Sequence, residues 1–385
     1  MRDVLIIGAG PAGLAAAARL AAQGRDTLVL EEHDVVGRPA HCTGVLGHDA
    51  FAELDLPRDT ILSITRSAAF RAGHGDPVLI ESDRVIATVV DRPRFDAALA
   101  AKAQAAGAEL CTGARVDNIA VDAGGVTARV RGGEPVRARA VVVACGANYR
   151  FNRALGLGIP RAYVQSAQVE MPFAALPHID VRMGRALAPA GFAWAVPFVR
   201  GDVSYARLGL LCDTDARGRF AAFFAQIARE HGGHAAPPAP RMKMLPLGPV
   251  SKTVSDRVIA VGDAAGLVKP TTGGGIYYGL LSGVYAADTL DACLREGRLA
   301  ECDLRAYEVR WRERIGPDIR AGLTFRRLAS RLGDRGIHAL VELTRVDGIV
   351  PLLKETADFN WHRRAALALL RHPAFRRAVI TSIWS

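Results

Sequence analysis

Residues 1–31 place a glycine turn between two short apolar runs, and no other feature constrains the fold as strongly. The run Asp3 to Ile7 is rich in β-branched residues and is typical of a buried parallel strand. The turn Gly8-x-Gly10-x-x-Gly13 follows, and an Ala-rich stretch leads to a second apolar run that ends before Glu31. This order predicts a strand–helix–strand unit of the kind that binds dinucleotides.

Each glycine of this turn has its own expected role. Gly8 permits the tight turn, Gly10 lets the backbone approach a pyrophosphate, and Gly13 lets the helix pack closely on the strand. The helix N-terminus then offers free N–H groups to the phosphates. Glu31 is expected to accept hydrogen bonds from ribose hydroxyls and to repel a 2′-phosphate, which favours FAD or NAD over NADP at this site.

A second segment of nucleotide-binding type follows much later in the chain. Arg257–Val261 is predicted to be a buried strand, and the pair Gly262-Asp263 comes directly after it. An Asp at this point can bind a ribityl hydroxyl, a group that FAD carries and NAD lacks. Because both segments are present, the sequence favours FAD. The glycine-rich turn Thr271–Gly275 then opens a long predicted helix.

The two segments enclose a β-rich region, which predicts a discontinuous α/β domain. Residues 1–160 and 250–300 are expected to form a Rossmann-like FAD-binding domain, with residues 161–249 inserted as a β-rich substrate-binding domain. Residues 51–90 resemble a small mixed insertion with short strands. A basic helical region is predicted for residues 301–385.

The excess of positive charge calls for an anionic partner. The chain has 49 Lys+Arg against 39 Asp+Glu, a net charge of +10, and 16 of these cations lie in residues 301–385. Nucleic acid is not expected, because no recognition motif accompanies the charge. Paired arginines beside the apolar stretches Ala365–Leu370 and Phe375–Trp384 predict amphipathic helices. Such helices can rest on an anionic membrane or capture a diphosphate, and an Arg-rich solvated face is the alternative.

Cysteine spacing and the N-terminus bear on the compartment. The six cysteines form no C-x-x-C pair and no Cys/His cluster with zinc spacing, so we expect reduced thiols and no metal site. The chain runs directly into a strand rather than a signal peptide, and no stretch of about 18 uninterrupted apolar residues is present. We therefore expect a cytoplasmic protein, with peripheral association on the cytoplasmic face of a membrane as an extension.

Three longer segments carry a resemblance. They are Gly262–Ile276 with its Pro-Thr-Thr-Gly-Gly-Gly core, the loop Gly37–Gly44, and the stretch Pro189–Pro197. Together they resemble the geranylgeranyl reductases, within the p-hydroxybenzoate hydroxylase-like flavoproteins. The third segment is similar to the substrate-cavity signature P-x-x-Y-x-W-x-F-P of that family, with Phe192 in place of Tyr and Val196 in place of Phe.

The resemblance implies an FAD-dependent oxidoreductase that reduces C=C bonds of an isoprenoid chain by hydride transfer from reduced flavin. The implied substrate is a prenylated lipid, a quinone or a prenyl diphosphate, and the implied electron donor is NADPH or a reduced ferredoxin. Cys42 is the implied catalytic residue, and His41, Tyr277 and Tyr278 are other candidate proton sources.

The implied binding residues form two sets. Those of the substrate are Phe192, Trp194 and Val196, and those of FAD are Gly8, Gly10, Ala12, Gly13, Glu31, Cys42, Thr43, Arg92, Val116, Asp263, Gly275 and Ile276.

An FAD-dependent monooxygenase that acts on an aromatic or lipophilic metabolite is the alternative function. Related hydroxylases carry an Asp-Gly pair after the strand that is predicted here at Val141–Ala144. This chain has Cys145-Gly146 instead, which disfavours their way of handling NADPH. A non-catalytic or electron-carrying flavoprotein at a membrane is a third hypothesis.

Overall fold

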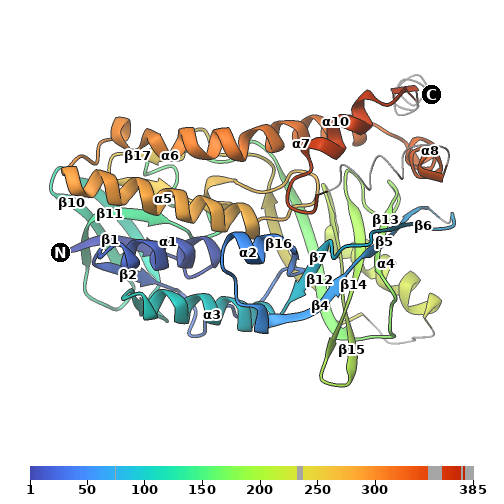
Figure 1. The fold of residues 1–385 in the computed structure, drawn as a ribbon, viewed down its shortest axis with the longest axis horizontal. Helices are drawn as coiled ribbons and strands as arrows, with labels where there is room; N and C mark the ends of the chain where they lie inside the picture. Colours follow the sequence, from blue (N-terminus) through green and yellow to red (C-terminus); the bar gives the residue numbers. More distant parts are fainter. Residues whose placement is uncertain (74, 232–236, 346–357, 374–375, 378–385) are drawn as a thin grey trace.

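Two large sheets divide the molecule into two halves (Figure 1). The computed structural model describes residues 1–73, 75–231, 237–345, 358–373 and 376–377. The N-terminal strand and its neighbours form one half, and the strands of the middle of the chain form the other. A smaller three-stranded sheet has the order β3-β7-β4, with bounds β3 Val45–Gly47, β4 Ile61–Thr65 and β7 Ala87–Val90.

The eight-stranded sheet contains both predicted nucleotide segments. Its order is β17-β18-β11-β1-β2-β8, and β9 and β10 extend it beside β11. Strand β1 runs parallel to both β2 and β11, and its residues Val4–Ile7 are buried, as the apolar run predicted. The strands are β1 Arg2–Ile7, β2 Thr27–Leu30, β8 Glu109–Cys111, β9 Val116–Asp122, β10 Gly125–Val130, β11 Val136–Val143, β17 Val254–Ser255 and β18 Val258–Ala260.

Helix packing brings the two nucleotide segments together. Helix α1 (Pro11–Ala22), with Pro11 in its first turn, crosses helix α5 (Ile276–Glu296). A Cβ at Gly283 of α5 would lie only 2.2 Å from the carbonyl oxygen of Ala12, so the contact requires glycine. The short helix η2 (Gly262–Ala265) lies against the same turn. Segments about 250 residues apart in the chain therefore meet at the start of α1.

The seven-stranded sheet includes strands from outside the predicted insertion. Its order is β16-β12-β15-β14-β13-β5-β6, so residues 67–81 join strands of residues 163–246. One face of the sheet packs on helix α4 (Ala216–Glu230), whose buried side chains include Phe220 and Phe223. The strands are β5 Ser67–Ala72, β6 Val78–Glu81, β12 Tyr163–Pro172, β13 Ile179–Met183, β14 Phe192–Arg200, β15 Val203–Cys212 and β16 Arg241–Pro246.

Helices of the C-terminal region extend from the first half to the end of the second sheet (Figure 1). Of the predicted amphipathic stretches, Ala365–Leu370 lies in α10, whereas Phe375–Trp384 falls outside the described residues apart from Arg376 and Arg377. In the described part of the chain, no helix has the length and apolar character needed to span a membrane. The remaining helices are α2 Ala50–Glu53, η1 Arg58–Thr60, α3 Arg92–Ala105, α6 Glu301–Arg314, α7 Gly316–Ala329, α8 Asp334–Arg345 and α10 Arg363–Arg371.

Several sequence-predicted elements are shorter or longer than expected. The strand predicted over Glu109–Ile119 is two strands, β8 and β9, because the chain turns at Gly113, whose φ is +66°. The helix predicted over Phe220–His231 begins earlier, at Ala216, where the carboxylate of Asp215 accepts a hydrogen bond from the N–H of Gly218. The strand predicted over Arg257–Val261 is present but shorter, as the buried β18, because Arg257 has a φ of +63° and is not in extended backbone.

Candidate active site

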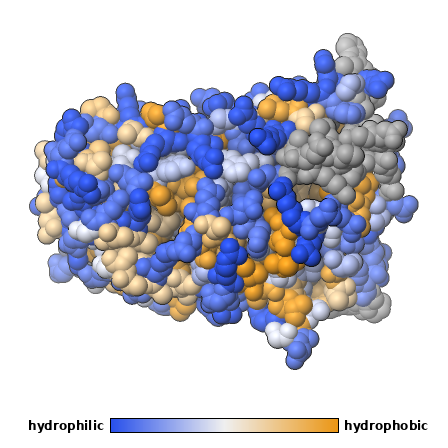
Figure 2. Space-filling model, in the orientation of Figure 1, coloured by the Kyte–Doolittle hydropathy of each residue, from blue (hydrophilic) through white to orange (hydrophobic). Residues whose placement is uncertain are grey.

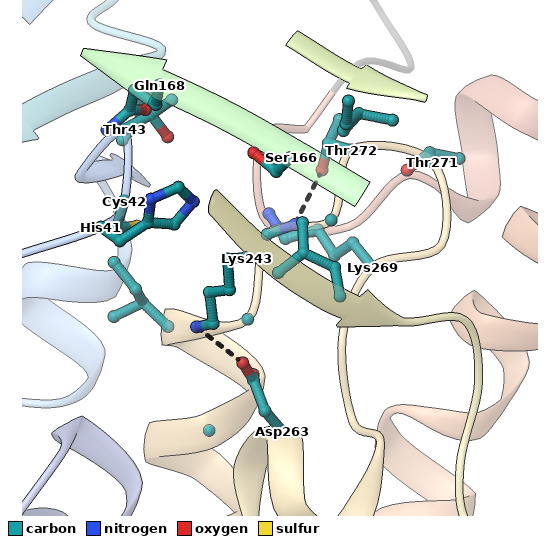
Figure 3. A pocket seen from close by; sticks show the side chains of 18 of the residues that line it. His41, Cys42, Thr43, Ser166, Gln168, Lys243, Asp263, Lys269, Thr271 and Thr272 are labelled. Carbon is teal, nitrogen blue, oxygen red and sulfur yellow. Dashed lines mark hydrogen bonds and ion pairs between the residues drawn. The ribbon is translucent and has the colours of Figure 1, made fainter. Parts of the chain in front are cut away.

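A cavity of about 980 Å³ lies between the two large sheets and continues beneath the C-terminal helices. At one end it is lined by the glycine turn Gly8–Ala12 and by Asp263 of the second nucleotide segment. At the other end it is lined by the inner face of the seven-stranded sheet and by side chains of α7, α8 and α10. The loop that contains His41, Cys42 and Thr43 lies between these two ends (Figure 3).

The glycine turn is shaped as its spacing predicts. A Cβ at Gly8 would lie 2.5 Å from the carbonyl oxygen of Ala144, and a Cβ at Gly13 would lie 2.1 Å from the carbonyl oxygen of Gly8. These two glycines are therefore required by the packing of strand and helix. By contrast, a Cβ at Gly10 would meet no atom within 4 Å and would project into the cavity end. The free space at Gly10 fits the close approach of a phosphate group.

Glu31 lies beside this turn at the end of β2. Its carboxylate accepts hydrogen bonds from the N–H groups of Ala9 (2.7 Å) and His33 (3.1 Å). The side chain is buried to all but about a tenth of its surface and lines the cavity. The two backbone bonds fix the carboxylate at the position where the predicted ribose hydroxyls would meet it.

Asp263 is held from both halves of the molecule. Lys243 of β16 places its Nζ 3.2 Å from the Asp263 carboxylate, and both side chains line the cavity (Figure 3). The hydroxyl of Tyr149 donates to the backbone oxygen of Asp263 at 2.7 Å. A Cβ at Gly275 would lie 2.5 Å from the Asp263 carboxylate, so glycine leaves room for that carboxylate at the start of α5. The ion pair joins strand β16 of the seven-stranded sheet to the short helix η2 beside the eight-stranded sheet.

Cys42 lies beside a buried cation. Its sulfur accepts a hydrogen bond from the N–H of Gly44 at 3.4 Å and contacts the guanidinium of Arg92. Arg92 binds the carboxylate of Asp96 through two nitrogens, at 2.7 and 3.1 Å. Burial acts to lower the pKa of Arg92, but Asp96 and Cys42 outweigh it and raise that pKa. The guanidinium is therefore a permanent positive charge next to the thiol.

His41, the residue before Cys42, is neutral at physiological pH. Burial lowers the pKa of its imidazole to about 4, and the charges of Lys243 and Arg241 act in the same direction. Its Nδ1 is buried without a hydrogen-bond partner among the described residues. Because an orphaned buried N–H costs more than an orphaned lone pair, we assign the proton to Nε2. His41 then acts as a neutral hydrogen-bond donor.

The inner face of the seven-stranded sheet changes from polar to apolar across its strands. One cross-strand row is Gln168, Gly209, Trp194, Val181 and Phe70, on β12, β15, β14, β13 and β5 respectively. A Cβ at Gly209 would lie 2.6 Å from the Trp194 ring, so glycine allows the indole to lie across β15. The polar end of the row is next to the Cys42 loop, and the apolar end provides a wall that suits a hydrocarbon chain.

The cavity gathers nearly all the sequence-predicted site residues. Its lining includes Gly8, Gly10, Ala12, Glu31, Cys42, Thr43, Arg92, Val116, Phe192, Trp194, Val196, Asp263, Gly275 and Ile276. Gly13 lies outside the lining, in the contact between strand and helix. Their roles in binding remain predictions. Tyr277 and Tyr278 do not line the cavity, and their hydroxyls donate to Glu53 and Asp318 respectively. Both observations disfavour these tyrosines as proton sources.

Several cavity residues were not identified from the sequence. They are Ser166, Gln168, Lys243, Lys269, Arg326, Phe359 and His362. Lys269 stands inside the Gly262–Ile276 run, and the scarcity of lysine in the chain was the only signal that could have singled it out. The others come from elements whose position depends on long-range packing.

The nucleotide end of the cavity fits FAD in three independent features. Gly10 leaves open space where a pyrophosphate would lie, Glu31 holds a fixed acceptor for a ribose, and Asp263 holds a second acceptor at the start of α5. NAD has no ribityl hydroxyl that the Asp263 carboxylate could bind. These residues would therefore hold FAD with its adenosine toward β2 and its ribityl chain toward Asp263.

Comparisons with known proteins agree with the geometry. Residues 3–331 match the family model described as lycopene cyclase protein. The digeranylgeranylglycerophospholipid reductase of Methanocaldococcus jannaschii is 27% identical to this chain, over 90% of this chain and 92% of that protein. A solved geranylgeranyl bacteriochlorophyll reductase-like protein from Thermoplasma acidophilum has a TM-score of 0.84, with 23% identity and 99% of both chains covered.

Flavin-dependent enzymes of other kinds share the fold. A halogenase solved in complex with FAD has a TM-score of 0.69 and 16% identity, over 100% of this chain and 91% of that one. The predicted flavoprotein fold and the predicted resemblance to geranylgeranyl reductases are both confirmed. The chain therefore belongs to the lycopene cyclase protein family, and over nearly its whole length it is similar to reductases of the geranylgeranyl type.

Proposed function

We propose that the protein is an FAD-dependent reductase that saturates C=C bonds of an isoprenoid chain carried by a lipid, a quinone or a diphosphate. The observation that carries this proposal is the continuous cavity, which leads from the FAD-type turn past Cys42 to an apolar wall. The relative from Methanocaldococcus jannaschii is named for a digeranylgeranylglycerophospholipid, a substrate of this class.

FAD, once reduced, would supply the hydride for this reaction. The chain's own residues then have to align a substrate that offers few polar groups. The sheet side chains Phe192, Trp194 and Val181 provide one apolar wall, and Ile337 and Leu369 of the C-terminal helices provide part of the opposite one. Such confinement contributes to rate because an aligned pair of reactants gains roughly 7–11 kcal/mol over a free encounter.

We assign the proton to the thiol of Cys42. The alkene gains one hydride and one proton, and Cys42 is the thiol that the Gly37–Gly44 loop presents to the cavity. When the thiol gives up its proton, the adjacent Arg92 guanidinium stabilises the thiolate. His41 does not compete for this role at neutral pH, since its imidazole is uncharged. The electron donor, NADPH or a reduced ferredoxin, remains a prediction from the resemblance.

Apolar side chains gather on the outer surface of the half that contains the seven-stranded sheet (Figure 2). Exposed residues of this half include Leu79, Val199 and Val203. We infer that this end, where the cavity is apolar, is the end that meets a lipid-borne substrate. Peripheral association with an anionic membrane is compatible with this arrangement.

Lipid mass spectrometry tests the proposed function. Prenyl lipids extracted from cells that express the gene should gain two mass units per saturated bond, relative to cells that carry a Cys42→Ala variant. A loss of proton supply should slow prenyl saturation by roughly 10²- to 10⁴-fold, the range of general acid catalysis, so that little saturated lipid accumulates in the variant. If the prenyl lipids of both cell types are identical while another metabolite gains oxygen, the protein is a monooxygenase instead.

A further inference from the structure

Two cations at the substrate end of the cavity, the buried Lys269 and the half-buried Arg326, form no ion pair among the described residues. The ammonium of Lys269 donates to the carbonyl oxygen of Phe359, and Arg326 of α7 donates to the carbonyl oxygens of Pro270 (3.1 Å) and Ala190. Both side chains line the cavity. Neither forms an ion pair with a carboxylate in the part of the chain that the structure describes.

Three arginines of the described residues that are at most about one-seventh exposed are paired with carboxylates. Arg92 binds Asp96, Arg182 binds Asp180, and Arg207 binds Glu170. Burying a charge without a partner is costly, because the group loses its hydration and gains no counter-ion. The contrast between paired and unpaired cations therefore marks the buried Lys269, with the half-buried Arg326 that binds the adjacent Pro270 carbonyl, as an anion-binding position.

The acidic groups near Lys269 are already engaged. Asp318 accepts hydrogen bonds from the Tyr278 hydroxyl and from the N–H groups of His362 and Arg363. Asp358, which also lines the cavity, accepts from two N–H groups of its own loop, at 2.7 and 3.2 Å. Burial lowers the pKa of Lys269 to about 8 although both carboxylates oppose the shift, so they do not fully compensate its charge.

We propose that Lys269 and Arg326 bind the anionic phosphate or diphosphate headgroup of the prenyl substrate. The inference rests on the proposed function and narrows its substrate class to phosphate-bearing isoprenoids. Guanidinium and ammonium groups are the side chains best suited to phosphate oxygens. The hydroxyl of Thr272 lines the same end of the cavity and adds a donor (Figure 3). From this point the apolar tail extends along Phe192 toward Val181.

The test compares two prenyl ligands that differ only in the headgroup. Geranylgeranyl phosphate and geranylgeraniol are titrated into the FAD-loaded protein, and binding is followed by the change in flavin absorbance. The wild-type protein should prefer the phosphate by about 10- to 100-fold, and Arg326→Gln should reduce this preference below about 3-fold with little change for the alcohol. Arg327→Gln is the matched control, because Arg327 is the exposed neighbour on the same helix.

A second variant and a pH series separate binding from structural damage. Arg326→Lys keeps the charge and should retain a preference for the phosphate, and the melting temperature of each FAD-loaded variant shows whether the fold persists. The preference should fall as pH rises above about 8, because Lys269 then loses its proton, whereas the neutral His362 nearby, with a pKa of about 3, does not titrate in this range.

The outcomes distinguish this inference from the proposed function. Equal affinity for geranylgeranyl phosphate and geranylgeraniol contradicts the headgroup site but leaves the proposed function intact. The same holds if Arg326→Gln and Arg327→Gln have equal effects. If inorganic phosphate binds, but geranylgeranyl phosphate binds no more tightly than geranylgeraniol, the site takes free phosphate and the inference is wrong. If neither prenyl ligand binds, both the proposed function and this inference are wrong.

Discussion

Replacing Gly10 with valine should give a folded protein that no longer retains FAD. The backbone at Gly10 (φ −78°, ψ 173°) is open to any L-residue, and a Cβ there would meet no atom of the protein within 4 Å. The new methyl groups would instead occupy the space where the pyrophosphate is expected. We expect FAD affinity to fall at least about 100-fold, or about 2.7 kcal/mol, with the unfolding midpoint of the FAD-free protein nearly unchanged.

Gly13→Ala is the informative comparison. The added Cβ would lie 2.1 Å from the carbonyl oxygen of Gly8 and 3.0 Å from the Cβ of Ala144, so strand and helix would have to separate. This variant should lower the unfolding midpoint even without FAD. Thermal unfolding of the FAD-free proteins, combined with titration of FAD, measures both effects. Wild-type FAD affinity in Gly10→Val would contradict the placement of the pyrophosphate.

The second large effect is expected at Arg207 of β15. Its guanidinium binds the Glu170 carboxylate (2.8 Å) and the carbonyl oxygens of Thr43 (2.6 Å) and Val90 (3.0 Å), and it is almost fully buried. Arg207→Met would leave two backbone acceptors without a partner and would release the Cys42–Thr43 loop from the sheet. We expect the free energy of unfolding to fall by about 3–5 kcal/mol, measured by chemical denaturation.

Arg200→Met provides the control, because Arg200 binds the same Glu170 but is 40% exposed. Its loss should cost less than about 1 kcal/mol. Burial raises the pKa of Glu170, but Arg207 and Arg200 outweigh it and lower that pKa. Stabilisation by the pair is therefore present above the ordinary carboxyl pKa and is lost as pH falls through the folded value. The difference between wild type and Arg207→Met should narrow in acid, and a difference independent of pH would contradict the ion pair.

Local signals predicted the nucleotide half of the molecule well. The glycine turn, Glu31 and Gly262-Asp263 each encode backbone geometry within a few residues, and the structure brings all three to one end of the cavity. Their convergence could be inferred because a strand–helix–strand unit leaves little freedom of topology. The resemblance supplied the remaining predicted residues, Cys42 and Trp194 among them.

The sequence did not predict the arrangement of the seven-stranded sheet, because it depends on contacts between residues far apart in the chain. Nothing local in residues 67–81 indicates that β5 pairs with β13, about 110 residues further along the chain. Lys243 and Arg326 resemble ordinary surface cations in the sequence, because their position in the cavity wall depends on elements far away in sequence. The loop at Phe359–His362 is held at the cavity by residues far away in sequence, Lys269, Thr271 and Asp318 among them.

Anaerobic single turnover is the most direct test of the proposed function. The FAD-loaded protein is reduced with dithionite and mixed, without oxygen, with a geranylgeranyl-bearing phospholipid or geranylgeranyl phosphate, and flavin absorbance and product mass are recorded together. Prenyl reduction predicts that the flavin reoxidises and that the product gains two mass units for each flavin oxidised. A flavin that stays reduced until oxygen is admitted, followed by a gain of 16 mass units in an added substrate, would contradict it.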